Sequence, residues 1–238
     1  MSHDLTALSA AVTEPRDVPP ARLLGRLLGA AALVSPVALG AQYAVDPTGM
    51  LPRDDAAALL AAVAESPGRY VAATLVYLLG IVTLIGWAAV LALAARRHAP
   101  VLSTVTAVLL VIGAVAGAGF AALRLTAAAL TENGAPITGA TQAWTRVQDG
   151  APFLVLAPAL IAVVLATLLT AIVMLRCRRD IPVWAGPAYL AGFVLASGEL
   201  PGVLSVAGGL VQAVAVWPVV RQALGRRTAR TGGIHPAS

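Results

Sequence analysis

One arginine stands alone in a long uncharged stretch of this sequence. In the run GFAALRLTAAAL, Arg124 is the only charged residue. A guanidinium deep in a bilayer needs a partner, whereas one near the headgroups can extend its stem to them. The uncharged run from Val101 to Leu123 would cover about 34 Å as a helix, slightly more than a hydrocarbon core. We therefore expect the arginine at the membrane edge, in contact with headgroups or with a carboxylate of Glu132, Asp149 or Glu199.

Side chains that could catalyse a reaction are scarce in the apolar parts of the chain. His3 and His235 lie near the two ends, and His98 belongs to a basic turn. The single cysteine, Cys177, allows neither an internal disulfide nor a thiolate cluster. A metal centre, a haem site or an intramembrane serine protease would need a base or a ligand at membrane depth. We therefore expect no catalytic residue, no metal site and no cofactor.

Two further polar residues are candidates for a structural or functional role. Gln212 lies near the middle of an apolar run, where a glutamine bonds to a neighbouring helix more often than to a ligand. Glu199 is the one carboxylate placed for proton-coupled transport, although it lies at the end of an apolar run instead of its middle.

Small residues recur at a spacing of four in two apolar runs. Gly113 and Gly117 are four apart, as are Ala188 and Gly192. Residues at this spacing share one face of a helix, and small side chains there let two backbones approach closely. Because alanine and glycine are abundant, we expect these pairs to pack helices within the chain. Nothing in the sequence supports a homo-oligomer.

The composition is that of a membrane protein. Of the 238 residues, 59% are hydrophobic and 11% are charged, and the mean hydropathy is +0.85. Soluble domains carry about 25% charged residues, so a soluble fold would lack the charge to cover its surface. A net charge of +5 would suggest nucleic acid as the partner of a soluble protein. Here the arginines lie at the ends of apolar runs, so we expect a lipid bilayer as the partner and no nucleic acid.

Charged residues divide the chain into six apolar runs. Each is close to the length of about 20 residues that crosses a bilayer as a helix. The predicted fold class is therefore all-α, a polytopic transmembrane bundle of six helices within residues 22–222. The predicted spans are 27–45, 70–95, 100–123, 151–175, 181–198 and 201–220. Residues 1–21 and 223–238 are predicted to be disordered tails.

The positions of the arginines predict the orientation of the chain. With a cytoplasmic N-terminus, twelve arginines fall on the cytoplasmic side and four on the outer side. This agrees with the excess of basic residues in short cytoplasmic loops. All sixteen basic residues are arginine, which together with the many alanines suggests a bacterial source. We expect a multi-pass protein of the bacterial plasma membrane with both termini in the cytoplasm, where its arginine clusters could contact anionic lipid.

The longer connections fall on the predicted outer side. Asp54 or Asp55 is placed to cap a short helix rich in alanine and leucine, which Pro67 would end. In the next outer connection, Trp144 is expected to anchor the chain at the membrane interface.

Three stretches carry a resemblance to a known family. They are DDAAALLAAVAESPGRYVAATLVYLLG, which contains Arg69, the pair Arg124-Leu125, and the basic turn RCRRDIPVWAGPAYLAG. In this order they resemble the domain of unknown function 4386 family, whose members are bacterial membrane proteins of six spans. Where members carry an acidic residue after the Arg-Leu pair, this chain has Ala127 and Ala128. The resemblance implies a six-helix membrane protein without an established activity, and it makes both arginines candidates for a role beyond anchoring.

Three classes of function are compatible with these features. The lack of catalytic groups and the small residues along the spans favour a non-enzymatic membrane module that binds a lipid, a small ligand or a partner protein. The alternative is the membrane subunit of a transporter, such as the six-span permease half of an exporter. Such a subunit needs coupling segments, and the cytoplasmic connections RRHAP and RCRRDIP are short. An intramembrane enzyme acting on lipid is disfavoured because no carboxylates or histidines are suitably spaced.

Overall fold

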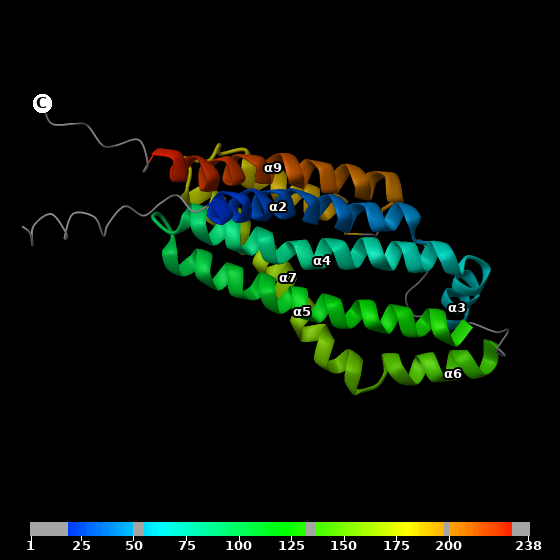
Figure 1. Cartoon of the computed structure of the whole chain (residues 1–238). Helices are drawn as coiled ribbons and strands as arrows, with labels where there is room; N and C mark the ends of the chain where they lie inside the picture. Colours follow the sequence, from blue (N-terminus) through cyan, green and yellow to red (C-terminus); the bar gives the residue numbers. More distant parts are fainter. Residues whose placement is uncertain (1–18, 50–54, 132–136, 198–199, 230–238) are drawn as a thin grey trace, which may run out of the picture.

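The computed structural model describes residues 19–49, 55–131, 137–197 and 200–229, and these residues form helices joined by short turns (Figure 1). The helices are α2 (Pro19–Val45), α3 (Ala56–Glu65), α4 (Pro67–Ala95), α5 (Pro100–Thr131), α6 (Ile137–Gln148), α7 (Ala151–Arg176), α8 (Ala185–Leu195) and α9 (Gly202–Ala229). Five of them, α2, α4, α5, α7 and α9, are long and apolar enough to cross a membrane. No strand occurs among the described residues, so the all-α prediction is confirmed for them.

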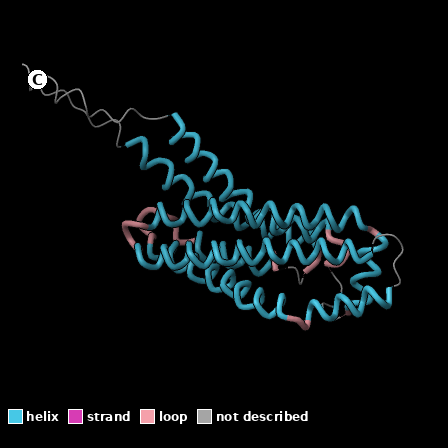
Figure 2. The backbone as a smooth tube through the Cα atoms, turned by 60° about the horizontal axis from the view of Figure 1, so that its bottom comes forward, coloured by secondary structure: helices cyan, strands magenta, loops and turns pink. Residues whose placement is uncertain are grey.

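Six helices form a ring in which each helix packs against two neighbours. The order around the ring is α2, α4, α5, α7, α8 and α9, and α9 packs back against α2. The helices run along one long axis, with most of the loops at its two ends (Figure 2). The ring buries a continuous apolar cluster that includes Trp87 and Leu91 of α4, Val173 of α7 and Val216 of α9.

The two ends of the bundle differ. Helices α3 and α6 pack against each other at one end, which we call the cap end (Figure 1). The other end, which we call the arginine end, holds the first turn of α2 and the last turn of α9. Its turns carry the exposed residues Arg96, Arg97, Arg178 and Arg179.

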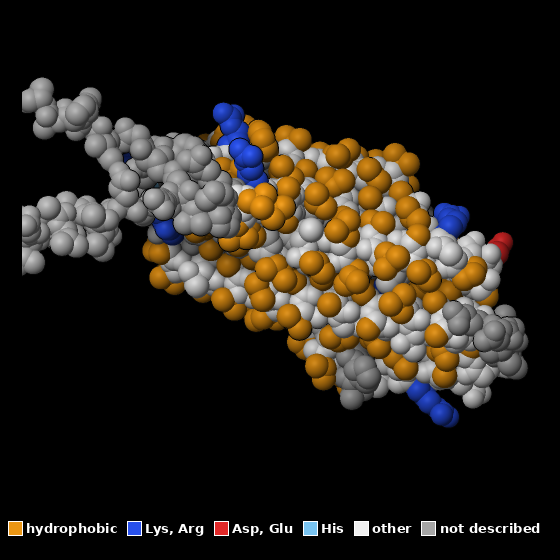
Figure 3. Space-filling view, in the orientation of Figure 1, with side chains coloured by type: hydrophobic (Ala, Val, Ile, Leu, Met, Phe, Trp, Pro, Cys, Tyr) orange, Lys and Arg blue, Asp and Glu red, His pale blue; other side chains and the backbone are white. Residues whose placement is uncertain are grey.

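The outside of the ring is apolar between these two ends. On α4, for example, Leu75, Leu79 and Val82 are all more than half exposed. Figure 3 shows arginine side chains near the two ends of the visible face and a broad hydrophobic band between them. Such a band is suited to contact with the hydrocarbon of a lipid bilayer.

The fifth predicted span is shorter than expected. Residues 181–198 were expected to form one helix, but α8 has only eleven residues, about 16 Å of helix or half a hydrocarbon core. Pro182 disfavours a helical conformation in the residue before it, and the chain turns until α8 begins at Ala185. At its other end, the N–H of Ala196 bonds back to the carbonyl of Gly192 and closes the helix.

Other helices are longer than predicted. Helix α5 continues to Thr131, so Arg124 lies about two turns before its end. Helix α9 extends to Ala229, into the predicted tail 223–238, because the added segment contains no proline and is rich in residues with good helix propensity. Helix α2 likewise begins at Pro19 instead of after residue 21. The rest of both predicted tails lies outside the described residues.

The cap end contains one predicted helix and one that was missed. Helix α3 begins where expected, with the Asp55 side chain accepting a hydrogen bond of 2.9 Å from the N–H of Ala58. Helix α6 was not predicted, since its sequence has few strongly apolar residues. Trp144 on α6 is only 6% exposed and packs with Leu60 and Val63 of α3, so its assignment as an interface anchor was wrong.

Candidate functional site

Arg124 is paired with a carboxylate inside the bundle. Its Nη2 lies 2.6 Å from Oδ2 of Asp46, the residue that follows α2, and the two side chains are 11% and 2% exposed. The three carboxylates suggested by the sequence are therefore not its partner. Glu132 and Glu199 lie outside the described residues, and Asp149 is exposed beyond the end of α6.

Each charge of this pair has further partners. Nε of Arg124 donates to Oγ1 of Thr74 at 3.0 Å, and the guanidinium carbon lies 4.6 Å from the centre of the Tyr70 ring. The second oxygen of Asp46 accepts hydrogen bonds from the backbone N–H and the hydroxyl of Thr48, at 2.9 and 2.7 Å. Buried charges are tolerated when they are paired and hydrogen-bonded in this way. The pair is neutral as a whole, and it joins α2, α4 and α5 near the cap end.

A cavity of about 400 Å³, the cap cavity, lies beside this pair. Asp46, Arg124 and Tyr70 line one part of it, and α6 contributes Trp144 and Val147. Helices α3 and α6 thus help to enclose a space that the ring alone would leave open at this end.

A second cavity of about 410 Å³, the bundle cavity, lies between the helices of the ring. Every helix of the ring contributes to its wall, with Leu39 from α2, Leu84 from α4, Leu110 from α5, Val163 from α7, Phe193 from α8 and Val216 from α9. Both cavities fall within the range of about 300–1,000 Å³ typical of small-molecule sites.

The two cavities adjoin each other. Four residues line both of them, and together we call these residues the neck: Gln42, Tyr43, Tyr77 and Leu160. A molecule lodged at the neck would therefore contact both spaces at once.

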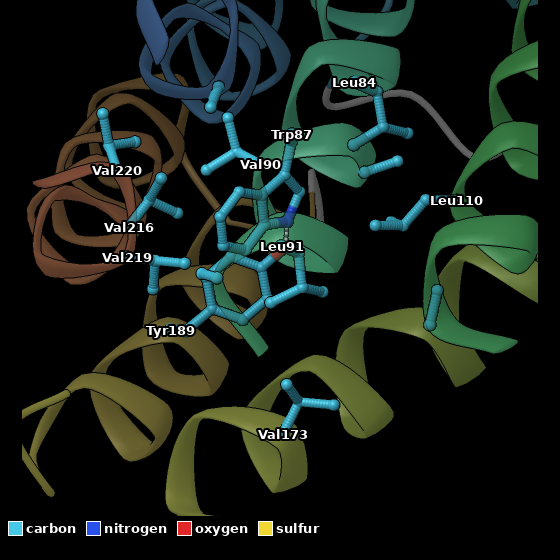
Figure 4. Close-up of a cluster of buried hydrophobic side chains, with 14 of the residues drawn as sticks. Leu84, Trp87, Val90, Leu91, Leu110, Val173, Tyr189, Val216, Val219 and Val220 are labelled. Atoms are coloured by element: carbon cyan, nitrogen blue, oxygen red, sulfur yellow. Dashed lines mark hydrogen bonds between the residues drawn. The ribbon is translucent and has the colours of Figure 1, made fainter. Parts of the chain in front are cut away.

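Several polar side chains around the bundle cavity bond to groups on neighbouring helices. Nε1 of Trp87 donates to the hydroxyl of Tyr189 at 3.2 Å, and the two rings lie next to each other at a tilt of 41° (Figure 4). Nε2 of Gln212 lies 3.4 Å from the backbone carbonyl of Tyr189, so this glutamine bonds to a neighbouring helix. The hydroxyl of Ser35 donates to the carbonyl of Gly80 at 2.9 Å. These bonds connect different helices and hold the walls of the cavity in place.

Arg69 does not line either cavity as described. Arg69 is exposed in the first turn of α4. Glu199 lies outside the described residues.

The small residues singled out in the sequence lie at contacts within the chain. A Cβ atom added to Gly113 would meet Val163 of α7, and one added to Gly117 would lie 2.6 Å from a side-chain carbon of Ile81 on α4. Ala188 is partly buried against the main core. A Cβ atom on Gly192 would lie 2.7 Å from a backbone carbonyl oxygen of α9.

Sequence reasoning missed Asp46 and the neck. Asp46 ends an apolar run, where a charged residue is ordinary and gives no sign of a buried pair. The neck residues come from three helices and have no common spacing along the chain. Gln42 carried the best available signal, since an amide near the end of an apolar run has few solvent partners.

The described residues contain no group of three histidine, cysteine or acidic side chains close enough to hold a metal ion. His98 and Asp180 do meet at the arginine end, with Nε2 and Oδ2 2.7 Å apart, and Gln222 donates to the same oxygen at 2.8 Å. This exposed cluster joins two turns to α9, a structural role. The chemistry that the cavities offer is thus the enclosure of an apolar molecule, with hydrogen bonding near the neck.

Comparison with known proteins found no match for this chain among family models, curated proteins or solved structures. The resemblance to the domain of unknown function 4386 family therefore stays a prediction.

Proposed function

We propose that this protein is a non-enzymatic membrane module that binds a small lipid-like molecule inside its helix bundle. The observation that carries this proposal is the pair of adjoining cavities that share the neck, of which the bundle cavity is lined by all six helices of the ring. Ligand sites in proteins are mostly apolar, with a few polar groups that orient the ligand. Both cavities have this character.

Blocking the neck should remove the bound molecule. Leu160 lines both cavities, so Leu160→Trp would place a large ring between them. We expect mass spectrometry of organic extracts from the purified protein to find a stoichiometric lipid-like molecule in the unmodified chain and several-fold less in the variant.

Ile161→Trp is the matched control. Ile161 is the next residue of α7 and is 58% exposed on the outside of the bundle. The same added ring there should leave the bound molecule in place. A protein that retains equal amounts in both variants, or that carries no molecule at all, would contradict the proposal.

We also propose that the chain crosses the bacterial plasma membrane six times, with both termini in the cytoplasm. The first turn of α2 and the last turn of α9 lie at the same end of the bundle, which supports an even number of crossings (Figure 1). Helix α8 and the turns beside it would complete the sixth crossing. The arginines at that end support its placement in the cytoplasm, where they could also contact anionic lipid.

A fusion experiment tests this topology. Alkaline phosphatase needs disulfides, which form outside the cytoplasm but not within it. We expect an active fusion after Pro136, the residue that precedes α6 in the sequence, and an inactive fusion after Arg97, at the arginine end. The reverse pattern would show that the cap end faces the cytoplasm.

The binding module is favoured over the permease half of an exporter. The turns at the arginine end, residues 96–99 and 177–184, contain no helix that could serve as a coupling segment. Copurification of an ATPase with this chain would reverse the preference.

A further inference from the structure

An amide without a partner lies at the neck. Gln42 is 4% exposed, lines both cavities, and makes no side-chain hydrogen bond with a described residue. By contrast, the other deeply buried glutamine, Gln212, bonds to a backbone carbonyl. An amide that borders two mostly apolar cavities without a described protein partner can bond only to a molecule that occupies them. A ligand at the neck would supply the missing partner.

A second unsatisfied donor lies in the wall of the cap cavity. Trp144 is 6% exposed, and its indole N–H has no hydrogen-bond partner among the described residues. An indole N–H can only donate, whereas the amide of Gln42 can donate and accept. Groups of these two kinds suit a ligand with an oxygen atom that accepts hydrogen bonds and, if it is a hydroxyl, also donates one.

The charges beside the neck argue against a charged ligand. Asp46 and Arg124 are the only aspartate, glutamate, lysine or arginine side chains among the described residues that line the cap cavity, and their charges neutralise each other. An anionic group could reach the Arg124 guanidinium only beside the Asp46 carboxylate, which would repel it. A cationic group could reach the Asp46 carboxylate only beside the guanidinium, which would repel it in the same way. Like charges brought together in a poorly solvated site are strongly unfavourable.

Resting on the proposed binding function, we infer that the ligand is an uncharged amphiphile with an oxygen-bearing head, such as a long-chain alcohol or an ester. Its head lies at the neck and hydrogen-bonds to Gln42, with Trp144 as a second donor on the cap side. Its hydrocarbon chain occupies the bundle cavity, whose wall is mostly apolar. Because Asp46 and Arg124 neutralise each other, fatty acids and amines of the same chain length bind more weakly at this site.

Four probes with the same chain and different heads test this inference. Oleyl alcohol is uncharged and oxygen-bearing, oleate is anionic, oleylamine is cationic, and octadecene has no polar head. Each is titrated into the delipidated full-length protein in detergent, and bound probe is counted by native mass spectrometry. We expect oleyl alcohol to bind about tenfold more tightly than the two charged probes and more tightly than octadecene.

Variants then identify the side chain that hydrogen-bonds to the polar head of the ligand. Gln42→Leu should weaken oleyl alcohol about fivefold, the value of one ordinary hydrogen bond, and leave octadecene binding unchanged. Unchanged octadecene binding also shows that the variant is folded. Gln142→Leu, the same change at an exposed position of α6, should alter neither probe. Trp144→Phe, which keeps a ring but removes the donor, should weaken the alcohol alone.

The possible results separate the two proposals. Oleate or oleylamine binding as tightly as oleyl alcohol would overturn the uncharged head and leave the binding function standing. Equal binding of oleyl alcohol to the unmodified protein and to Gln42→Leu would overturn the role of the neck amide. If none of the four probes binds, octadecene included, the proposed binding function itself is wrong.

Discussion

Arg124→Ala and Asp46→Ala are each expected to lower the free energy of unfolding by about 3–5 kcal/mol, because each leaves one buried charge without its partner. The remaining Asp46 carboxylate, 2% exposed, would keep only its bonds to Thr48. Arg124→Lys should also destabilise the protein, since an ammonium cannot reproduce both the Nε bond to Thr74 and the flat contact with the Tyr70 ring. Reversible unfolding of the purified protein in mixed detergent measures these losses.

Two further variants make the measurement specific to the pair. Arg69→Ala removes an exposed arginine from α4 and should change the stability by no more than about 0.5 kcal/mol. The double change of Arg124→Met with Asp46→Leu leaves neither charge unpaired, so it should recover most of the loss. If Arg124→Ala is as mild as Arg69→Ala, the guanidinium interacts with headgroups and the pair contributes nothing.

The helical architecture could largely be predicted from the sequence, for a simple reason. A bilayer core demands about 20 apolar residues for each crossing, and charged residues mark where these runs end. Run length therefore located α2, α4, α5, α7 and α9. For the majority of their ends, the predicted residue lies within a few positions of the observed one. It could not reveal that Pro182 delays α8, because a proline near the start of a run does not change its hydropathy. It also could not reveal α6, which packs on α3 at the cap end and does not need a membrane-length run.

The candidate site was harder to predict from the sequence than the helices, because it depends on which helices are neighbours. Arg124 attracted attention through its isolation in an uncharged run, but its partner was not identified. The sequence suggested headgroups or one of three other carboxylates, whereas the guanidinium is paired with Asp46 inside the bundle and α5 continues about two turns beyond it. Asp46 and Gln42 lie close together in the sequence at the end of α2. Only the packing of α2 on α4 and of α4 on α5 brings them to the arginine and to the cavities.

Close backbone packing was another feature that spacing alone did not locate. The search for small residues four apart found Gly113 and Gly117 but not the adjacent pair Gly208 and Gly209 of α9. Two adjacent residues point to different sides of a helix, about 100° apart, so each can face a different neighbour. A Cβ atom on Gly208 would lie 2.6 Å from the carbonyl oxygen of Gly192 on α8, and one on Gly209 would lie 2.5 Å from that of Pro36 on α2. Helix α9 is therefore held between two backbones.

Gly209→Ala is accordingly expected to destabilise the protein by about 1–3 kcal/mol, the usual cost of overpacking a well-packed core. The atoms that the new methyl group would meet belong to the backbone of α2 and cannot rotate away, so the two helices must separate. The matched control is Gly225→Ala on the same helix, where an added Cβ meets nothing within 4 Å. There the higher helix propensity of alanine should leave the stability unchanged or raise it by up to about 1 kcal/mol. Unfolding in mixed detergent should thus show a loss of stability for Gly209→Ala and no loss for Gly225→Ala. Equal changes at both positions would show that α9 does not approach α2 as closely as described.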